Sequence, residues 1–281
     1  MLQEQQQHPQ IAETYGITGL VFNSLGKHEV ALGQYEKGLV VQIAALGEDH
    51  PSIATTYNNI AGVYASQGKH EMALELREQS LATEIKALGE DHPRVASTHH
   101  KIALIYNKQG KYEMALELYE KCLEMQIKAL GEDHPHVAST YFDIAVIYNE
   151  QGKVEMALEL YTKCLAIQMK TLGEDHSCVA NTYNHIAAVY DKQGKDEMAL
   201  ELYEKCLAIQ IKSLGVHHPD VASTMYTMAS SLERQGELGR AGGLFRQRGN
   251  LQQVKTGRVL RLYGLQGYLA HKKSSHPPGP P

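Results

Sequence analysis

Fifteen histidines and four cysteines are the residues of this chain that could bind a metal or take part in catalysis. Six of the histidines recur every 42 residues, at His8, His50, His92, His134, His176 and His218. Because each stands at the same place in its copy of the repeat, we expect these histidines to act in helix starts. His99 and His100 are adjacent, so on a helix they point in different directions and cannot share a metal. The sequence therefore predicts no metal site.

The cysteines follow the same period. Cys122, Cys164 and Cys206 are spaced by 42 residues, and Cys178 stands apart from them. Packed helices lie about 8 to 10 Å apart, whereas the Cα atoms of a disulfide lie within about 7 Å of each other. We therefore expect the three repeated cysteines to be reduced core residues, which is consistent with a reducing compartment.

No motif of a known catalytic or cofactor site is present. The chain has no HExxH or CxxC spacing, no GxxxxGK[ST] phosphate loop and no GxSxG nucleophile turn. The acidic residues also recur with the repeat, so none forms a unique acid and base pair. The sequence predicts that the protein is not an enzyme and has no cofactor.

The period of 42 residues defines the organisation of the chain. LGEDHP begins at Leu46, Leu88 and Leu130, and it returns in altered form at Leu172 and Leu214. Counting back from these sites, six units begin at residues 9, 51, 93, 135, 177 and 219. Residues 9–245 therefore form the array, and residues 1–8 are a short N-terminal stub. The sixth unit is degenerate, because glycines weaken its second half.

Each unit has the pattern of two amphipathic helices. In residues 93–134 the apolar residues are spaced by three and four in two stretches, separated by the turn QGK. The glycine of this turn stands where a left-handed residue ends a helix. Proline opens the unit, as is typical of a first helical turn. Each unit is thus a helix, a tight turn, a longer helix and a loop.

The spacing of small and aromatic residues resembles the tetratricopeptide repeat. In the third unit these residues are Ala103, Tyr106, Ala115 and Tyr119, and Arg77 interrupts the pattern in the second unit. The resemblance implies an all-α fold, a right-handed superhelical solenoid of antiparallel helix pairs. A tetratricopeptide array is a platform on which other proteins bind.

The stretches QGKYEMALELYEKCL, LGEDHP and TYNNIAGVY are similar to the 42-residue repeats of kinesin light chains. In that family the array receives short peptides of cargo proteins in a concave groove. The resemblance implies a scaffold or cargo adaptor with a tentative link to microtubule-based transport. Light chains bind kinesin heavy chain through an upstream coiled coil, and this sequence shows no sustained heptads. The alternative is that the array is the sensor or scaffold part of a larger multidomain signalling protein.

The same resemblance assigns the groove to the first helix of each unit. The expected peptide-binding residues are Asn58, Asn59, His100, Lys101, Asn107, Lys108, Asn149, Asn184, His185 and Lys192. Asparagine both donates and accepts hydrogen bonds, which suits the backbone of an extended peptide, and the lysines can pair with acidic side chains. A solvated helix face is the alternative reading of any one of these positions.

Composition limits the partners. The net charge is -5 and the pI about 6.3, which gives no reason to expect nucleic acid. No apolar run is long enough to span a membrane, and the chain starts without the pattern of a signal peptide. We therefore expect a cytoplasmic protein whose partners are other proteins.

The C-terminal segment, residues 246–281, has a different composition. It contains seven Lys or Arg residues and no acidic residue. VLRLYGLQGYLA is expected to form a helix that caps the array, followed by a disordered tail. A cationic contact with RNA or a membrane is the alternative for this segment.

Overall fold

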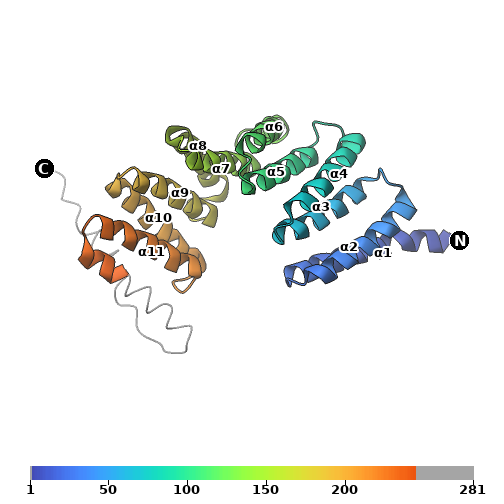
Figure 1. Ribbon diagram of the computed structural model, residues 1–281, viewed down its shortest axis with the longest axis horizontal. Helices are drawn as coiled ribbons and strands as arrows, with labels where there is room; N and C mark the ends of the chain where they lie inside the picture. The colour runs from blue at the N-terminus through green and yellow to red at the C-terminus, as the bar shows by residue number, and fades with distance from the viewer. Residues whose placement is uncertain (1, 245–281) are drawn as a thin grey trace, which may run out of the picture. The chain divides into compact units, whose positions relative to one another are not determined.

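The computed structural model describes residues 2–244, and the regular elements in that range are helices (Figure 1). The helices are α1 (Leu2–Ser24), α2 (His28–Leu46), α3 (Pro51–Ser66), α4 (His70–Leu88), α5 (Pro93–Lys108), α6 (Tyr112–Leu130), α7 (Pro135–Glu150), α8 (Val154–Leu172), α9 (Ser177–Lys192), α10 (Asp196–Leu214) and α11 (Pro219–Arg234). A further helix begins at residue 238 and continues to residue 244. α1 and α2, α3 and α4, α5 and α6, and α9 and α10 form antiparallel pairs. The all-α fold of helix pairs is confirmed.

The chain divides into two compact parts, Met1–Leu160 and Tyr161–Pro281, and the division falls within α8. In the first part α1 packs on α2, α3 on α4 and α5 on α6. The second helix of each pair also packs on the first helix of the next pair, as α4 does on α5. In the second part α9 and α10 form one such pair, and α10 packs on α11.

A histidine caps the first helix of each unit from the second onward. The Nδ1 atoms of His50, His92, His134, His176 and His218 each accept a hydrogen bond from the backbone N–H two residues further on, at 3.1 to 3.2 Å. These bonds satisfy one of the free N–H groups at a helix start. The predicted role of the repeated histidines is therefore confirmed for five of the six, whereas His8 lies inside α1.

Glycines end both helices of a pair. In the turn between α3 and α4, Gly68 has φ +74°, and the N–H of Lys69 reaches back to the carbonyl of Tyr64 at 2.9 Å. This geometry confirms the predicted left-handed glycine. A second set of glycines ends the longer helices, as at Gly89, which has φ +87° and donates to the Ile85 carbonyl. Sequence reasoning did not assign this second role.

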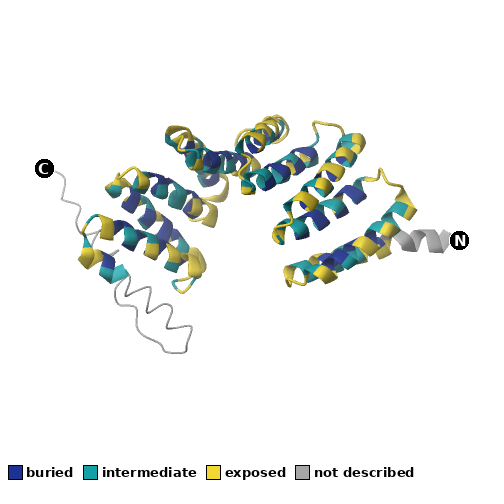
Figure 2. Cartoon of the chain, viewed as in Figure 1, coloured by how far each residue is buried: buried dark blue, intermediate teal, exposed yellow. Residues whose placement is uncertain are grey.

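Small residues and tyrosines form the core between paired helices. Figure 2 shows buried residues recurring along these helices. Ala103 and Ala115 are fully buried where α5 crosses α6, and Tyr119 fills the space beside them. Tyr106 is half-buried, and the ammonium group of Lys111 lies 5.7 Å from the centroid of its ring. The equivalent lysine lies over the equivalent aromatic ring in the neighbouring pairs.

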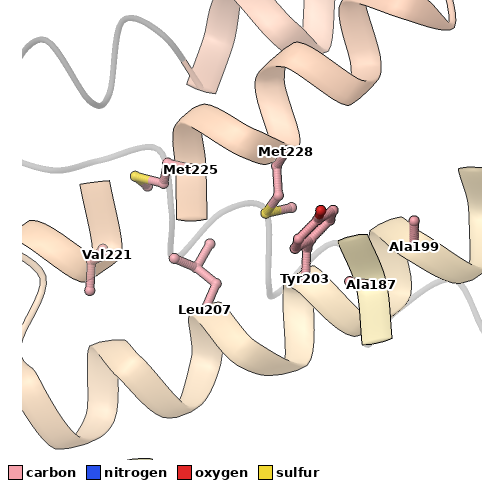
Figure 3. Close-up of a cluster of buried hydrophobic side chains, with 7 residues drawn as sticks. All are labelled: Ala187, Ala199, Tyr203, Leu207, Val221, Met225 and Met228. Carbon is pink, nitrogen blue, oxygen red and sulfur yellow. The ribbon is translucent and has the colours of Figure 1, made fainter. Parts of the chain in front are cut away.

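The second part has a core of the same kind. Figure 3 shows Tyr203 and Leu207 of α10 facing Met225 and Met228 of α11, with Ala187 of α9 beside them. All of these side chains are at least nine-tenths buried. Methionine fills irregular gaps, so Met228 can take the place of Ile186 in the preceding unit and Met225 that of Tyr183.

A buried hydrogen bond joins each second helix to the next unit. In the first part, Thr140 on α7 donates to Gln126 on α6 at 2.8 Å. In the second part, Thr182 on α9 donates to Gln168 at the same distance. Cys122, Cys164 and Cys206 are also buried at these joints as free thiols, with Cys122 Sγ 3.9 Å from Thr140 Oγ1, whereas Cys178 is exposed.

The two ends of the array differ from the interior. α1 begins at Leu2, so residues 2–8 belong to a helix instead of forming a separate stub. Leucine, glutamine and glutamate are good helix formers, so nothing before Pro9 ends the helix. Residues 246–281, with the predicted capping helix and tail, lie outside the described residues. Among residues 2–244, no helix is long and apolar enough to cross a membrane.

Candidate functional site

The residues predicted to bind a peptide lie on four first helices, and none of them is fully buried. They are Asn58 and Asn59 on α3, His100, Lys101, Asn107 and Lys108 on α5, Asn149 on α7, and Asn184, His185 and Lys192 on α9. The first three helices belong to the first compact part, and α9 belongs to the second.

Asn58 is at the centre of a hydrogen-bond network. Its Oδ1 accepts a hydrogen bond from Arg77 Nη1. Its Nδ2 donates to Ser80 Oγ at 2.5 Å and lies 3.4 Å from an oxygen of Glu84. Both ends of the amide are therefore occupied by the chain itself, and Asn58 holds its neighbours in place.

The partners of Asn58 are three unusual residues of α4. Arg77, Ser80 and Glu84 stand where α6 has Tyr119, Cys122 and Gln126. Their spacing places them on one face of the helix, and all three are more than nine-tenths buried. In the second unit a polar cluster thus replaces the usual core contacts.

The charges of this cluster are only partly balanced. Glu84 accepts a hydrogen bond from Thr98 Oγ1 at 2.7 Å and lies 3.4 Å from Arg94 Nη2. Burial lowers the pKa of Arg77 to about 10, although the charge of Glu84 opposes this shift. Arg77 Nε is buried and makes no hydrogen bond in the described part of the chain. Arginine stays protonated under these conditions, so its positive charge remains in the cluster.

Lys101 on α5 faces the same cluster. Burial lowers its pKa, and the charges of Arg77 and Arg94 lower it further, against the opposing effect of Glu84. A neighbouring cation disfavours the charged form of a lysine. Lys101 is thus held close to two other cations and a single buried carboxylate.

His100 is the next residue on the same surface. Its Nε2 lies 2.9 Å from Oδ2 of Asp143 on α7, and its ring stacks edge-on against Tyr119 at 5.2 Å between centroids. Burial raises the pKa of Tyr119, and the charge of Asp143 raises it further. The Tyr119 hydroxyl is therefore a neutral group under the His100 ring.

A cleft of about 490 Å³ opens between α5, the end of α6 and the start of α7. Two cationic residues, Arg94 and Lys101, lie in its wall. The remaining lining residues are histidines and uncharged residues: Pro93, Ala96, Ser97, His100, Gln126, Ala129, Leu130, His134, His136 and Ser139. No acidic side chain lines this cleft in the described structure.

The equivalent surface in the second part is less polar. His185 Nδ1 lies 3.3 Å from the hydroxyl of Tyr161, which occupies the position that Arg77 has in the second unit. Burial lowers the pKa of His185, so its ring is a neutral contact. Asn184 and Lys192 lie on the same helix as His185.

Comparison with known proteins identifies the repeat. The sequence profile of the tetratricopeptide repeat matches residues 10–86, 52–128, 94–170, 137–212 and 178–248. The chain belongs to the tetratricopeptide repeat family. The recognition made from the spacing of alanines and tyrosines is confirmed.

Solved structures of tetratricopeptide proteins place the chain near kinesin light chain-like repeats. A protein of Podosopora anserina, described as a kinesin light chain with nearly identical TPR-like repeats, is 31% identical and has a TM-score of 0.63. The match covers 75% of this chain and 99% of that one. A search of curated protein sequences gives no match.

More distant structures share the fold alone. BtubC (BKLC) from P. vanneervenii is 17% identical with a TM-score of 0.67, and the match covers 92% of this chain and 95% of that one. Aspartyl phosphate phosphatase F from Bacillus subtilis is 16% identical with a TM-score of 0.66, over 93% of this chain and 75% of that one. The tetratricopeptide fold is typically a non-catalytic scaffold for protein interaction.

The buried polar cluster on α4 was not predicted from the sequence. Sequence reasoning noted that Arg77 breaks the repeat pattern but did not connect this change to Ser80, Glu84 or Arg94. The signal was available, because three departures from the other units fall three and four residues apart on one helix. Comparing each unit with the others position by position would have found the polar cluster.

The nucleophiles and metal ligands of the described residues do not gather into a site. Burial raises the pKa of Cys122 and of Cys206 to about 11, so both remain thiols instead of reactive thiolates. No group of three or more His, Cys, Asp or Glu side chains in residues 2–244 is placed to bind a metal.

Proposed function

We propose that this tetratricopeptide array is an adaptor that holds a short peptide segment of another protein across the first helices of its units. The cleft between α5 and α7 is the observation that carries this proposal, because it offers hydrogen-bond donors and acceptors beside apolar wall. Clefts of this kind bind ligands through a few placed polar groups.

The proposed contacts follow from the predicted residues and their surroundings. Asn59, Lys101 and Lys108 lie on α3 and α5 with part of each side chain exposed. Asn58 supports them by holding Arg77 in place. His100, Asn107 and Asn149 extend this surface within the first part, and Asn184, His185 and Lys192 lie on the first helix α9 of the second part. The cytoplasm is the proposed location, and the 31% identity to a kinesin light chain-like protein supports cargo as the class of partner.

The experiment uses peptides selected from a random library displayed on phage, with the full chain as bait. The test variant carries Asn59→Glu, Lys101→Glu and Lys108→Glu, which changes the net charge by -5. The control variant carries Gln79→Glu, Lys86→Glu and Lys121→Glu, which makes the same change at exposed positions of the second helices. The selected peptides should bind the control like the original chain and should lose at least tenfold in affinity for the test variant. Equal loss in both variants would show that charge alone matters and would contradict the proposed surface.

One observation favours a second candidate function, a scaffold within a larger assembly. Ile11 is 42% exposed and Val21 is 51% exposed on α1, whereas their equivalents Ile53 and Val63 on α3 are fully buried against α2. Thr14 donates to a carbonyl of its own helix, while its equivalent Thr56 donates to Gln42 of α2. By continuity with this joint, the second helix of another tetratricopeptide unit would fit the α1 face.

A tandem fusion tests this candidate. A copy of residues 93–134 placed before residue 9, in register with the period, should raise the melting temperature and protect the α1 amides from hydrogen exchange. In a matched fusion the glutamine that stands at the position of Gln126 is replaced by leucine, which removes the partner of Thr14. Equal protection of α1 in the two fusions, or none in either, would argue against the candidate.

A further inference from the structure

The joint between the second and third units carries more buried positive charge than the other joints described. Arg77 is 8% exposed, and it occupies the position where the other second helices have a neutral tyrosine. Its neighbour across the joint is Lys101, and the equivalent pairs elsewhere are Tyr119 with Asp143 and Tyr161 with His185. Two cations are thus close together at this joint. The equivalent pairs at these two other joints consist of a tyrosine with an aspartate and a tyrosine with a histidine.

The nearby carboxylates are already engaged. Glu84 is 1% exposed, and its two oxygens contact Thr98, Asn58 and Arg94. Asp143 Oδ2 lies 2.9 Å from Nε2 of His100. Lys101 has no ion pair or hydrogen bond to any of the residues described. Its charge therefore has no direct ion-pair partner among residues 2–244.

The cleft between α5, α6 and α7 has space for an anion that would act as the counter-ion of Lys101. Arg94 and Lys101 lie in its wall, together with the hydroxyl groups of Ser97 and Ser139 and the rings of three histidines. The rings of His134 and His136 lie 5.0 Å apart at the start of α7. Cationic and hydroxyl donors converging on an acid-free cleft are the groups that bind an oxyanion.

We propose that this cleft binds a phosphorylated serine or threonine side chain of the captured peptide. The proposal rests on the peptide-binding function above and adds the chemistry of one subsite. A phosphoryl group carries a charge of about -1.5 to -2 near neutral pH and three acceptor oxygens. Arg77, Arg94 and Lys101 together exceed the charge of Glu84 by about the same amount. A single carboxylate would leave part of that excess unbalanced.

The test compares three degenerate peptide libraries that are identical except for a central phosphoserine, serine or glutamate. Binding to the full chain is measured by fluorescence polarisation at fixed ionic strength. The phosphoserine library should bind at least tenfold more tightly than the serine library, with the glutamate library between them. Inorganic phosphate should compete with the phosphoserine library and should leave the serine library bound.

Variants locate the effect. Lys101→Gln and Arg94→Gln should each remove most of the preference for phosphoserine, while Lys86→Gln should keep it, because Lys86 lies on the exposed side of α4 and pairs with Asp49. Circular dichroism melts of all three variants check that they fold. If Lys101→Gln does not fold, Lys101→Arg, which keeps the charge, must retain the preference.

The outcomes separate the two proposals. Equal binding of the serine and phosphoserine libraries overturns the phosphoryl subsite and leaves peptide capture standing. Failure of every library to bind overturns both. A preference that survives Lys101→Gln and Arg94→Gln, or an RNA oligonucleotide that binds as tightly as the phosphoserine library and is lost in the same variants, also overturns the subsite.

Discussion

At the scale of single residues, the histidine caps show how one side chain fixes a repeat boundary. His176 accepts a hydrogen bond from the backbone N–H of Cys178 at the start of α9. We predict that His176→Ala lowers the free energy of unfolding by about 1 kcal/mol, because the first turn loses its cap. Chemical denaturation followed by circular dichroism measures this change. His176→Asp provides the control, since a carboxylate replaces the lost acceptor. An equal loss in both variants would contradict a capping role.

In the protein without a bound ligand, the charge of Lys101 is expected to lower the stability of the fold. Burial lowers its pKa, and Arg77 and Arg94 add to the shift, so the folded state disfavours the protonated amine more than the unfolded state does. Lys101→Met is therefore expected to raise the melting temperature near neutral pH. The same change at the exposed Lys86 should not.

The lowered pKa of Lys101 also predicts how the stabilisation by Lys101→Met changes with pH. A lysine with a lowered folded pKa loses its penalty as the pH rises from that pKa towards the ordinary value of 10.5. The advantage of Lys101→Met over the original chain should thus shrink as the pH increases through the alkaline range. An advantage that stays constant would mean that packing, and not charge, causes it.

At the scale of helices, close approach within the first pair sets a requirement for glycine. A Cβ atom on Gly19 of α1 would lie 2.6 Å from the ring of Tyr35, which is almost fully buried, whereas a Cβ atom on Gly16 would meet open space. We predict that Gly19→Ala lowers the free energy of unfolding by about 1 to 3 kcal/mol through overpacking. Gly16→Ala should raise it by up to about 1 kcal/mol, because alanine favours the helix. Thermal melts of the two variants distinguish them, and stabilisation by both would contradict the close packing of α1 on α2.

The polar face of α4 is expected to behave as one unit. Replacing Arg77, Ser80 and Glu84 together by the tyrosine, cysteine and glutamine of α6 should leave stability unchanged or raise it, because a buried charged cluster gives way to packed neutral groups. Glu84→Gln alone should cost about 1 to 3 kcal/mol, since Arg77 and Arg94 then lose their counter-ion. A double-mutant cycle from denaturation curves measures the coupling. Additive single changes would show that the three residues act independently.

The sequence predicts helices better than it predicts what lies between them. The 42-residue period, the proline and histidine starts and the QGK glycines give α3 to α11 with their turns, because each depends on residues close in the chain. The glycines that end the longer helices also carry a local signal, and it was not used. The α4 cluster could not be derived in the same way, since Glu84 finds Thr98 and Arg94 on another unit.

At the scale of the whole molecule, the repeat separates what holds the array together from what distinguishes its units. The buried threonine and glutamine pair, the free cysteine and the tyrosine return at successive joints and supply packing. The partly exposed positions of the first helices change from unit to unit, as at Asn59, Lys101 and His185. The candidate site could be predicted from this contrast only as a surface. Its chemistry depends on the charges that α4 places behind Lys101.

The central claim is that partners bind along the first helices, and a spin-labelled peptide tests it most directly. A peptide selected on the full chain is spin-labelled and bound to the protein. The broadening of the protein NMR signals by the spin label is then recorded. The amide signals of Asn59, Lys101 and Asp143 should broaden strongly. The methyl signals of Met72, Met114 and Met156, which are 44 to 47% exposed on the second helices, should remain sharp. Broadening of the methionine methyls with unchanged amides on α3, α5 and α7 would contradict the account.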